Sequence, residues 1–177
     1  FDIRITAPDN VMEYMETFVT TERLIINERD NRVDHDPILV EISENRLERI
    51  ELNGSGVIIS EDTIFNQNLI VELGGSGSID LLIDCTELRT NLDGSGKITA
   101  SGNAEKANAF LDGSGFINSR NAFATEANAT LNGSGNIDIY ASDTFTGRVS
   151  GSGIIRYWGS PDSVITDIDG SGEILGI

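Results

Sequence analysis

The chain has 177 residues, which is enough for one domain with a substantial hydrophobic core. Its 29 acidic and 12 basic residues give a formal net charge of −17, so a nucleic-acid duplex or an anionic membrane would be repelled, while divalent cations and basic partners would be attracted. The chain lacks a run of about 18 apolar residues, which argues against a transmembrane segment.

The first 46 residues differ from the rest of the chain. Asn10 and Glu13 resemble a capping box that opens a short helical turn, and Glu28–Asp36 forms a polar, charged loop. The expected strands in this part are Phe1–Ala7, a stretch near Phe18–Asn27, and Ile38–Ile42. We interpret residues 1–46 as a divergent start of the same domain that covers one open end of the repeats, where backbone groups would otherwise be unpaired.

Residues 47–177 form a repeat built around the tripeptide Gly-Ser-Gly. The tripeptide occurs seven times, at successive spacings of 21, 19, 19, 20, 18 and 19 residues. Its glycines are Gly54, Gly56, Gly75, Gly77, Gly94, Gly96, Gly113, Gly115, Gly133, Gly135, Gly151, Gly153, Gly170 and Gly172. A unit this short can bury its apolar positions only by stacking on its neighbours. We expect each glycine pair where the chain turns or where a side chain would collide with the next coil.

Aliphatic residues flank each tripeptide at fixed positions. Two residues before the first glycine stand Leu52, Leu73, Leu92, Leu111, Leu131, Val149 and Ile168, and four residues after it stand Ile58, Ile79, Ile98, Ile117, Ile137, Ile155 and Ile174. Aliphatic, Gly, Gly and Ile therefore follow one another at steps of two, which is the period of a β-strand. The pattern predicts an all-β, single-stranded parallel β-helix of about seven coils, spaced about 4.8 Å apart. Strict alternation points the tripeptide serines outward, whereas a corner could turn them inward.

Cys85 is the one cysteine of the chain and stands in the apolar run Ile79–Cys85. A lone thiol cannot form an intrachain disulfide, so we interpret Cys85 as a small buried hydrophobe. Cysteine usage therefore leaves the cellular compartment undecided.

The repeats resemble the auto-transporter adhesin head GIN domain family. The matching features are the repeated Leu-Asn/Asp-Gly-Ser-Gly-x-Ile, the segment Ile50–Gly56, and Tyr157–Pro161 followed by Asp169–Gly172. The resemblance covers the chain from about Pro37 to the end. It implies a right-handed β-helix in an exported, often lipid-anchored bacterial protein of the cell surface, outer membrane or periplasm, with no established catalytic residues. Any export signal would precede Phe1.

Catalysis is the first alternative that the residues raise. Stacking would place Asp93 and Asp112 on neighbouring coils, near the carboxyl separation of roughly 5–5.5 Å found in retaining glycosidases. Coils of uniform length, however, leave no long loop to build a cleft. The one histidine, His35, lies in a charged loop, where a solvated side chain is expected. A carbohydrate-active enzyme is therefore the runner-up.

The sequence motifs give little support for a metal or phosphate site. Gly74–Ser78 resembles the start of a calcium-binding nonapeptide, but Ile79 stands where that motif needs Asp. Stacked Asp93 and Asp112 could still hold a cation incidentally. The repeat also lacks the GxGxxG and Lys-Ser/Thr patterns of phosphate loops. We expect no cofactor and no dedicated metal site.

An aromatic column gives the candidate binding site. The residues seven places after the first glycines are Glu61, Leu82, Ser101, Arg120, Tyr140, Trp158 and Ile177. If the coils stack in register, Arg120, Tyr140 and Trp158 form an outward ladder suited to sugar faces or a protein partner. Stacked aromatics that merely stabilise the coils are the competing interpretation.

The sequence therefore favours a non-catalytic, exported, adhesin-like or scaffold-like module that presents a rigid face to a glycan or protein. A rigid spacer of a lipoprotein is a further alternative. The end at Ile177 lacks an evident cap, so we expect either that the sequence stops short there or that a partner covers this end, of which a second copy of the chain is one candidate.

Overall fold

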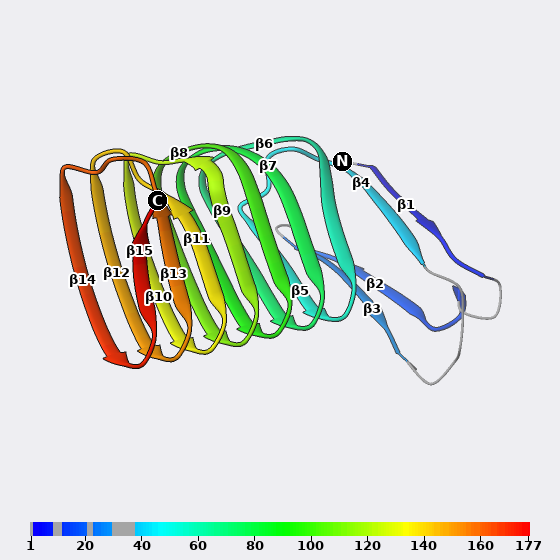
Figure 1. Ribbon diagram of the computed structural model, residues 1–177. Coiled ribbons are helices and arrows are strands. Elements are labelled where there is room, and N and C mark those ends of the chain that lie inside the picture. Colours follow the sequence, from blue (N-terminus) through cyan, green and yellow to red (C-terminus); the bar gives the residue numbers. More distant parts are fainter. Residues whose placement is uncertain (1, 9–11, 21–22, 30–37) are drawn as a thin grey trace. The chain divides into compact units, whose positions relative to one another are not determined.

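The computed structural model describes residues 2–8, 12–20, 23–29 and 38–177, and its elements are β-strands (Figure 1). The chain divides into two compact units, Phe1–Glu44 and Asn45–Ile177. The described residues include no helix with the length and apolar character needed to cross a bilayer.

The first unit contains two antiparallel strand pairs. These are β1 (Asp2–Thr6) with β4 (Leu39–Ser43), and β2 (Met15–Val19) with β3 (Leu24–Glu28). The strand expected near Phe18–Asn27 is wrong as a single element, because a turn interrupts it: the Thr20 N–H donates to the Arg23 carbonyl oxygen at 2.9 Å.

Two other predictions for the N-terminal part concern residues outside the described ranges. Asn10 of the capping box lies there, as does most of the loop Glu28–Asp36. The capping role of residues 1–46 stays a prediction.

The second unit is a parallel β-solenoid of about seven turns, as the repeat predicted. Its strands are β5 (Arg49–Gly54), β6 (Val57–Gly75), β7 (Ser78–Gly94), β8 (Lys97–Gly113), β9 (Phe116–Phe123), β10 (Glu126–Gly133), β11 (Asn136–Tyr140), β12 (Thr144–Gly151), β13 (Ile154–Trp158), β14 (Ser163–Gly170) and β15 (Glu173–Gly176). Their pairings are parallel and join each coil to the next.

Each Gly-Ser-Gly corner divides its coil into two surfaces. We call the outward side of the strands that lead into the corners the pre-glycine face; it is formed by β5, β10, β12, β14 and the later parts of β6, β7 and β8. We call the outward side of the strands that leave the corners the post-glycine face; it is formed by β9, β11, β13, β15 and the first parts of β6, β7 and β8. In Figure 1 the corners line up along the lower edge of the coils.

The corner explains both glycines of the tripeptide. Gly113 has a φ of +126°, a left-handed conformation that L side chains rarely adopt, and its carbonyl oxygen accepts hydrogen bonds from Ser134 N at 3.0 Å and Gly135 N at 3.1 Å. A Cβ on Gly115 would lie 2.6 Å from the Gly96 carbonyl oxygen and 2.6 Å from Leu92 Cδ2. The first glycine therefore allows the chain to turn. The second, which has no side chain, allows the preceding coil to pack closely against it.

The core is a stack of the two aliphatic columns found in the sequence. Inner members such as Leu111 and Ile117 are fully buried, and the seven tripeptide serines are exposed, as strict alternation predicts. Burial declines at the last coil, where Ile168, which occupies the inward Leu position, is 47% exposed. Self-association through this end stays a prediction.

Cys85 lies in the core, 7% exposed and without a disulfide partner, which confirms its interpretation as a buried hydrophobe. Burial, together with the neighbouring Asp84 carboxylate, raises the pKa of the Cys85 thiol from 9.0 to about 11.

We expect Gly115→Ala to lower Tm by several degrees, because a Cβ in this contact costs about 1–3 kcal/mol. Gly56→Ala is the matched control: it has the same place in the repeat, but its Cβ would meet only Leu52 Cδ1, at 3.3 Å. Thermal unfolding followed by circular dichroism measures both. Equal losses in the two variants would contradict the stacking explanation.

Cys85 should make stability fall at alkaline pH. Because its pKa is raised in the folded state, its contribution is fully present below about pH 9 and is lost as the pH rises towards 11. Urea unfolding at stepped pH should show a steeper alkaline decline for the wild type than for Cys85→Ala. A thiol reagent should modify Cys85 slowly in the native protein and quickly in urea. Rapid native labelling would refute this burial.

Candidate functional site

The predicted ladder forms in part. Tyr140 at the end of β11 pairs in register with Trp158 at the end of β13, so these two rings lie on neighbouring coils of the post-glycine face. Further back the column is broken. Ser101 pairs with Asn121 rather than Arg120, since the register between β8 and β9 shifts by one residue after Thr99. The expected alignment of Ser101 with Arg120 is therefore wrong.

A similar shift occurs earlier in the solenoid. The register between β6 and β7 changes after Ile59, and Leu82 pairs with Thr63 rather than with Glu61. A β-bulge adds a residue to one strand of a pair and re-aims the side chains after it. The column is thus continuous only over part of its length.

Arg120 still reaches the aromatic residues. Its guanidinium Cζ lies 5.9 Å from the centroid of the Trp158 ring, within the range of a cation–π contact. Arg120 is exposed, whereas Tyr140 and Trp158 are half-buried. The structure therefore brings all three predicted residues into one cluster.

Phe123 is a fourth member that the sequence analysis missed. Its ring packs edge-to-face against Tyr140, with centroids 5.1 Å apart, and the residue is 55% exposed. The tenth residue after the first glycine points inward in the preceding coils, as Cys85 and Ala104 do. The extra residue in β9 turns Phe123 outward instead. The signal was the 20-residue spacing from Gly113 to Gly133, one longer than the spacing before it.

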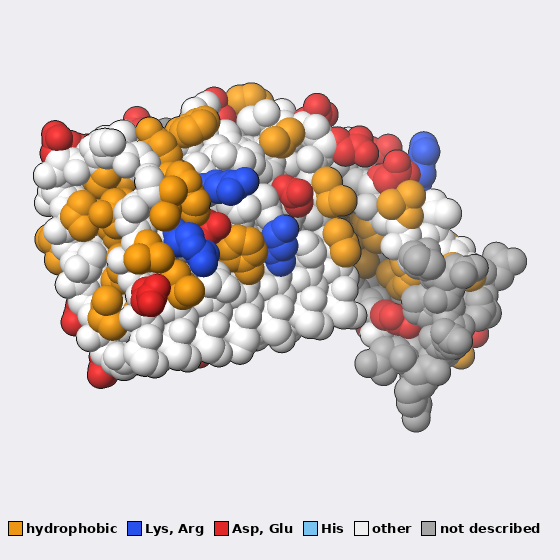
Figure 2. All heavy atoms as spheres, in the orientation of Figure 1, with side chains coloured by type: hydrophobic (Ala, Val, Ile, Leu, Met, Phe, Trp, Pro, Cys, Tyr) orange, Lys and Arg blue, Asp and Glu red, His pale blue; other side chains and the backbone are white. Residues whose placement is uncertain are grey.

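We call Arg120, Phe123, Tyr140 and Trp158 the aromatic patch. Two further contacts lie beside it on the post-glycine face. Lys97 Nζ is 5.9 Å from the centroid of the Phe116 ring. Arg156 Nη1 lies 3.3 Å from Asp138 Oδ1, and Asp138 is 7% exposed. Figure 2 shows Lys and Arg side chains among hydrophobic ones on the surface of the repeat unit.

The carboxylates considered for catalysis lie elsewhere. Asp93 and Asp112 pair in register on neighbouring coils, as predicted, and both are exposed on the pre-glycine face beside the corner. An exposed pair in open solvent lacks the desolvation that a general acid needs. His35 lies outside the described residues. Within the described ranges, no three His, Cys, Asp or Glu side chains gather closely enough to hold a metal ion.

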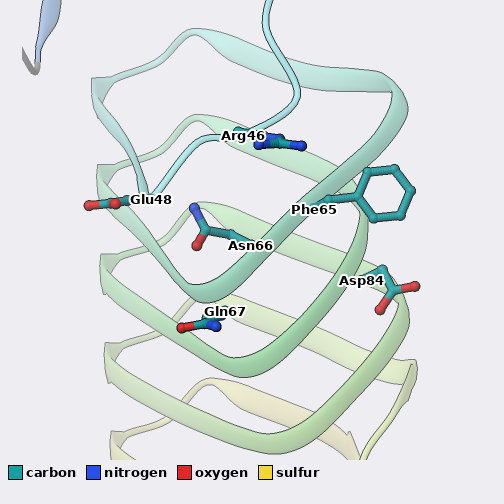
Figure 3. Close-up of a pocket in the computed structure, with 6 residues that line it drawn as sticks. All are labelled: Arg46, Glu48, Phe65, Asn66, Gln67 and Asp84. Carbon is teal, nitrogen blue, oxygen red and sulfur yellow. The ribbon is translucent and has the colours of Figure 1, made fainter.

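A hollow of about 530 Å³ lies at the first coils, lined by Arg46, Glu48, Phe65, Asn66, Gln67 and Asp84. Figure 3 shows Glu48 on one side of the coils, with Phe65 and Asp84 on the opposite side. These side chains do not converge on a common point, as the reactive groups of an active site must. The aromatic patch is therefore the stronger candidate site, and its rings and guanidinium can contact sugar faces or protein side chains.

Comparison with known proteins identifies a family and several structures of similar fold. The sequence family described as "putative auto-transporter adhesin, head GIN domain" matches residues 1–161. No curated protein matches the chain in sequence.

Solved structures of similar fold come from Bacteroides and Parabacteroides species. A putative adhesin from Bacteroides fragilis is 25% identical, with a TM-score of 0.89 over 99% of this chain and 82% of that one. A putative lipid binding protein from Parabacteroides distasonis is also 25% identical, with a TM-score of 0.76 over 99% of this chain and 83% of that one. A putative adhesin from the same organism is 22% identical, with a TM-score of 0.78 over 99% of this chain and 83% of that one. At this identity the similarity supports the fold and nothing further.

Proposed function

Because this chain belongs to the family of putative auto-transporter adhesins with a head GIN domain, we propose that it is a non-catalytic binding module of the cell surface or periplasm. The names of its family and structural neighbours, which are adhesin names and one lipid binding protein name rather than enzyme names, support this proposal. Attachment to the outer membrane through a lipid anchor is part of the same proposal.

The aromatic patch is the binding surface that we assign to this function. The observation that carries the assignment is the cluster itself: Tyr140 and Trp158 are held in register by backbone pairing, and Arg120 and Phe123 contact them. Tyr and Trp offer a large contact area with little rotamer entropy to lose on binding. Partners recognised by such residues include glycans and proteins.

The rigidity of the solenoid supports a binding role over an enzymatic one. Strands on both sides of β11 fix its backbone, since β11 pairs with β9 and with β13. The paired strands therefore hold the rings in one arrangement, so little conformational entropy of this surface is lost when a partner binds. Catalysis would instead require a desolvated acid, whereas Asp93 and Asp112 are exposed.

The test is Trp158→Ala in a screen of immobilised glycans and extracellular proteins against the whole chain. Loss of a central aromatic anchor costs about 2 kcal/mol or more, so we expect the Kd for any partner found to rise roughly thirtyfold. Phe110→Ala is the matched control, because Phe110 is 40% exposed but lies on the pre-glycine face. It should leave the Kd within about twofold of the wild type.

Circular dichroism should show the same strand signal in both variants. An unchanged Kd in Trp158→Ala, or an equal loss in Phe110→Ala, would refute the aromatic patch as the binding surface.

A further inference from the structure

We infer that the ligand of the post-glycine face is an acidic polysaccharide, a chain of sugars that carry carboxylate or sulfate groups. This inference rests on the proposed function, because it specifies the partner of the same surface. It follows from how the cations of the solenoid are distributed between the two faces.

On the pre-glycine face, cations are paired with carboxylates. The ion pairs are Arg49 with Glu72, Arg89 with Glu87 at 3.6 Å, Lys106 with Glu126 at 3.9 Å, and Arg148 with Asp167 at 3.1 Å. Such pairing is what an acidic chain should produce, since carboxylates outnumber cations by 29 to 12. The positive charge of this face is therefore neutralised locally.

On the post-glycine face, two cations have aromatic rings as neighbours instead. Lys97 lies over Phe116 and Arg120 over Trp158, each 5.9 Å from the ring centroid. Within the described part of the chain, neither has a carboxylate at ion-pair distance. A ring holds a cation in place without cancelling its charge, so both remain able to bind an anion.

A third cation of this face, Arg156, is ion-paired, so it can offer hydrogen-bond donors but adds no uncompensated positive charge. It pairs with Asp138, which is nearly buried, while about a third of the Arg156 side chain is exposed. Lys97 opens the coil after Gly94, and Arg156 lies in the coil after Gly151, three coils further on. At about 4.8 Å per coil the two are separated by roughly 14 Å. A ligand that contacts all three cations must therefore be extended.

The rings determine which extended anion fits best. Aromatic side chains contact the apolar C–H faces of sugar rings, while Lys and Arg bind their carboxylate or sulfate groups. An acidic polysaccharide carries both features in every few units. A free inorganic anion would use the cations and leave the rings without a partner.

The overall charge of the chain disfavours larger anionic surfaces. A membrane or duplex that reached this face would also come within a Debye length of about 10 Å of other parts of a chain with net charge −17. A single polysaccharide strand that contacts Lys97 and Arg120 brings fewer charges near those parts than a membrane or duplex does, although exposed Asp80 and Glu173 limit its path on this face. The geometry therefore favours a thin, flexible anionic chain.

The experiment measures binding of the whole chain to polygalacturonate, hyaluronate and a sulfated glycan, and to methyl-esterified polygalacturonate as the neutral match. We expect binding to at least one acidic glycan, with much weaker binding to the ester and a loss of affinity as salt is raised. The double variant Lys97→Gln/Arg120→Gln should bind at least tenfold more weakly. Arg89→Gln/Arg148→Gln removes the same charge from the pre-glycine face and should bind like the wild type.

The outcomes separate this inference from the proposed function. If the ester or another neutral glycan binds equally well and depends on Trp158 alone, the acidic-ligand inference is wrong and the binding function stands. If no acidic glycan binds, or both double variants lose affinity equally, the inference is also overturned. Binding to phosphatidylserine vesicles in place of the glycans would identify a membrane ligand and overturn it as well.

Discussion

The hydrogen bonds at the Gly-Ser-Gly corners are the constraint on which the solenoid depends. At each corner that is followed by another coil, the carbonyl oxygen of the first glycine approaches that coil so closely that it accepts from two of its N–H groups, as Gly113 does from Ser134 and Gly135. No side chain fits between coils at this distance. The corner therefore holds the coils in register, and that register aligns the Leu and Ile columns of the core.

A fixed corner leaves the outward columns free to vary. Inward positions must together fill the core, since interiors are close-packed, so a large side chain such as Phe145 is accommodated beside a small one such as Ala127. Outward positions meet solvent and one another, so they can accumulate charge pairs on one face and rings with cations on the other. The binding that we propose for this chain is accordingly assigned to its outward columns.

Much of the solenoid could be predicted because the same strand pattern, with a period of two, occurs in seven successive units of 18 to 21 residues. Few folds can bury the apolar positions of all seven units. The positions of Leu92, Gly94, Gly96 and Ile98 recur in every coil as aliphatic, Gly, Gly and Ile, and only parallel stacking buries the aliphatic copies together. The N-terminal part was harder to predict because it has no repeat. There the run Phe18–Asn27 looks continuous, yet a turn at Thr20 and Arg23 makes it a hairpin.

By itself, the sequence determined the coil architecture, the inward columns and the in-register pair Tyr140–Trp158, because each follows from the periodicity of the repeat, whereas the structure decided that the tripeptide serines point outward. Only the tertiary structure decided where the extra residue of β9 is absorbed. The bulge after Thr99 moves Arg120 out of line with Ser101 and turns Phe123 outward. The spacing between glycines gives the number of residues in a coil, whereas the position of the β-bulge depends on packing between neighbouring coils. Which cations meet carboxylates and which meet rings depends on that same packing across coils.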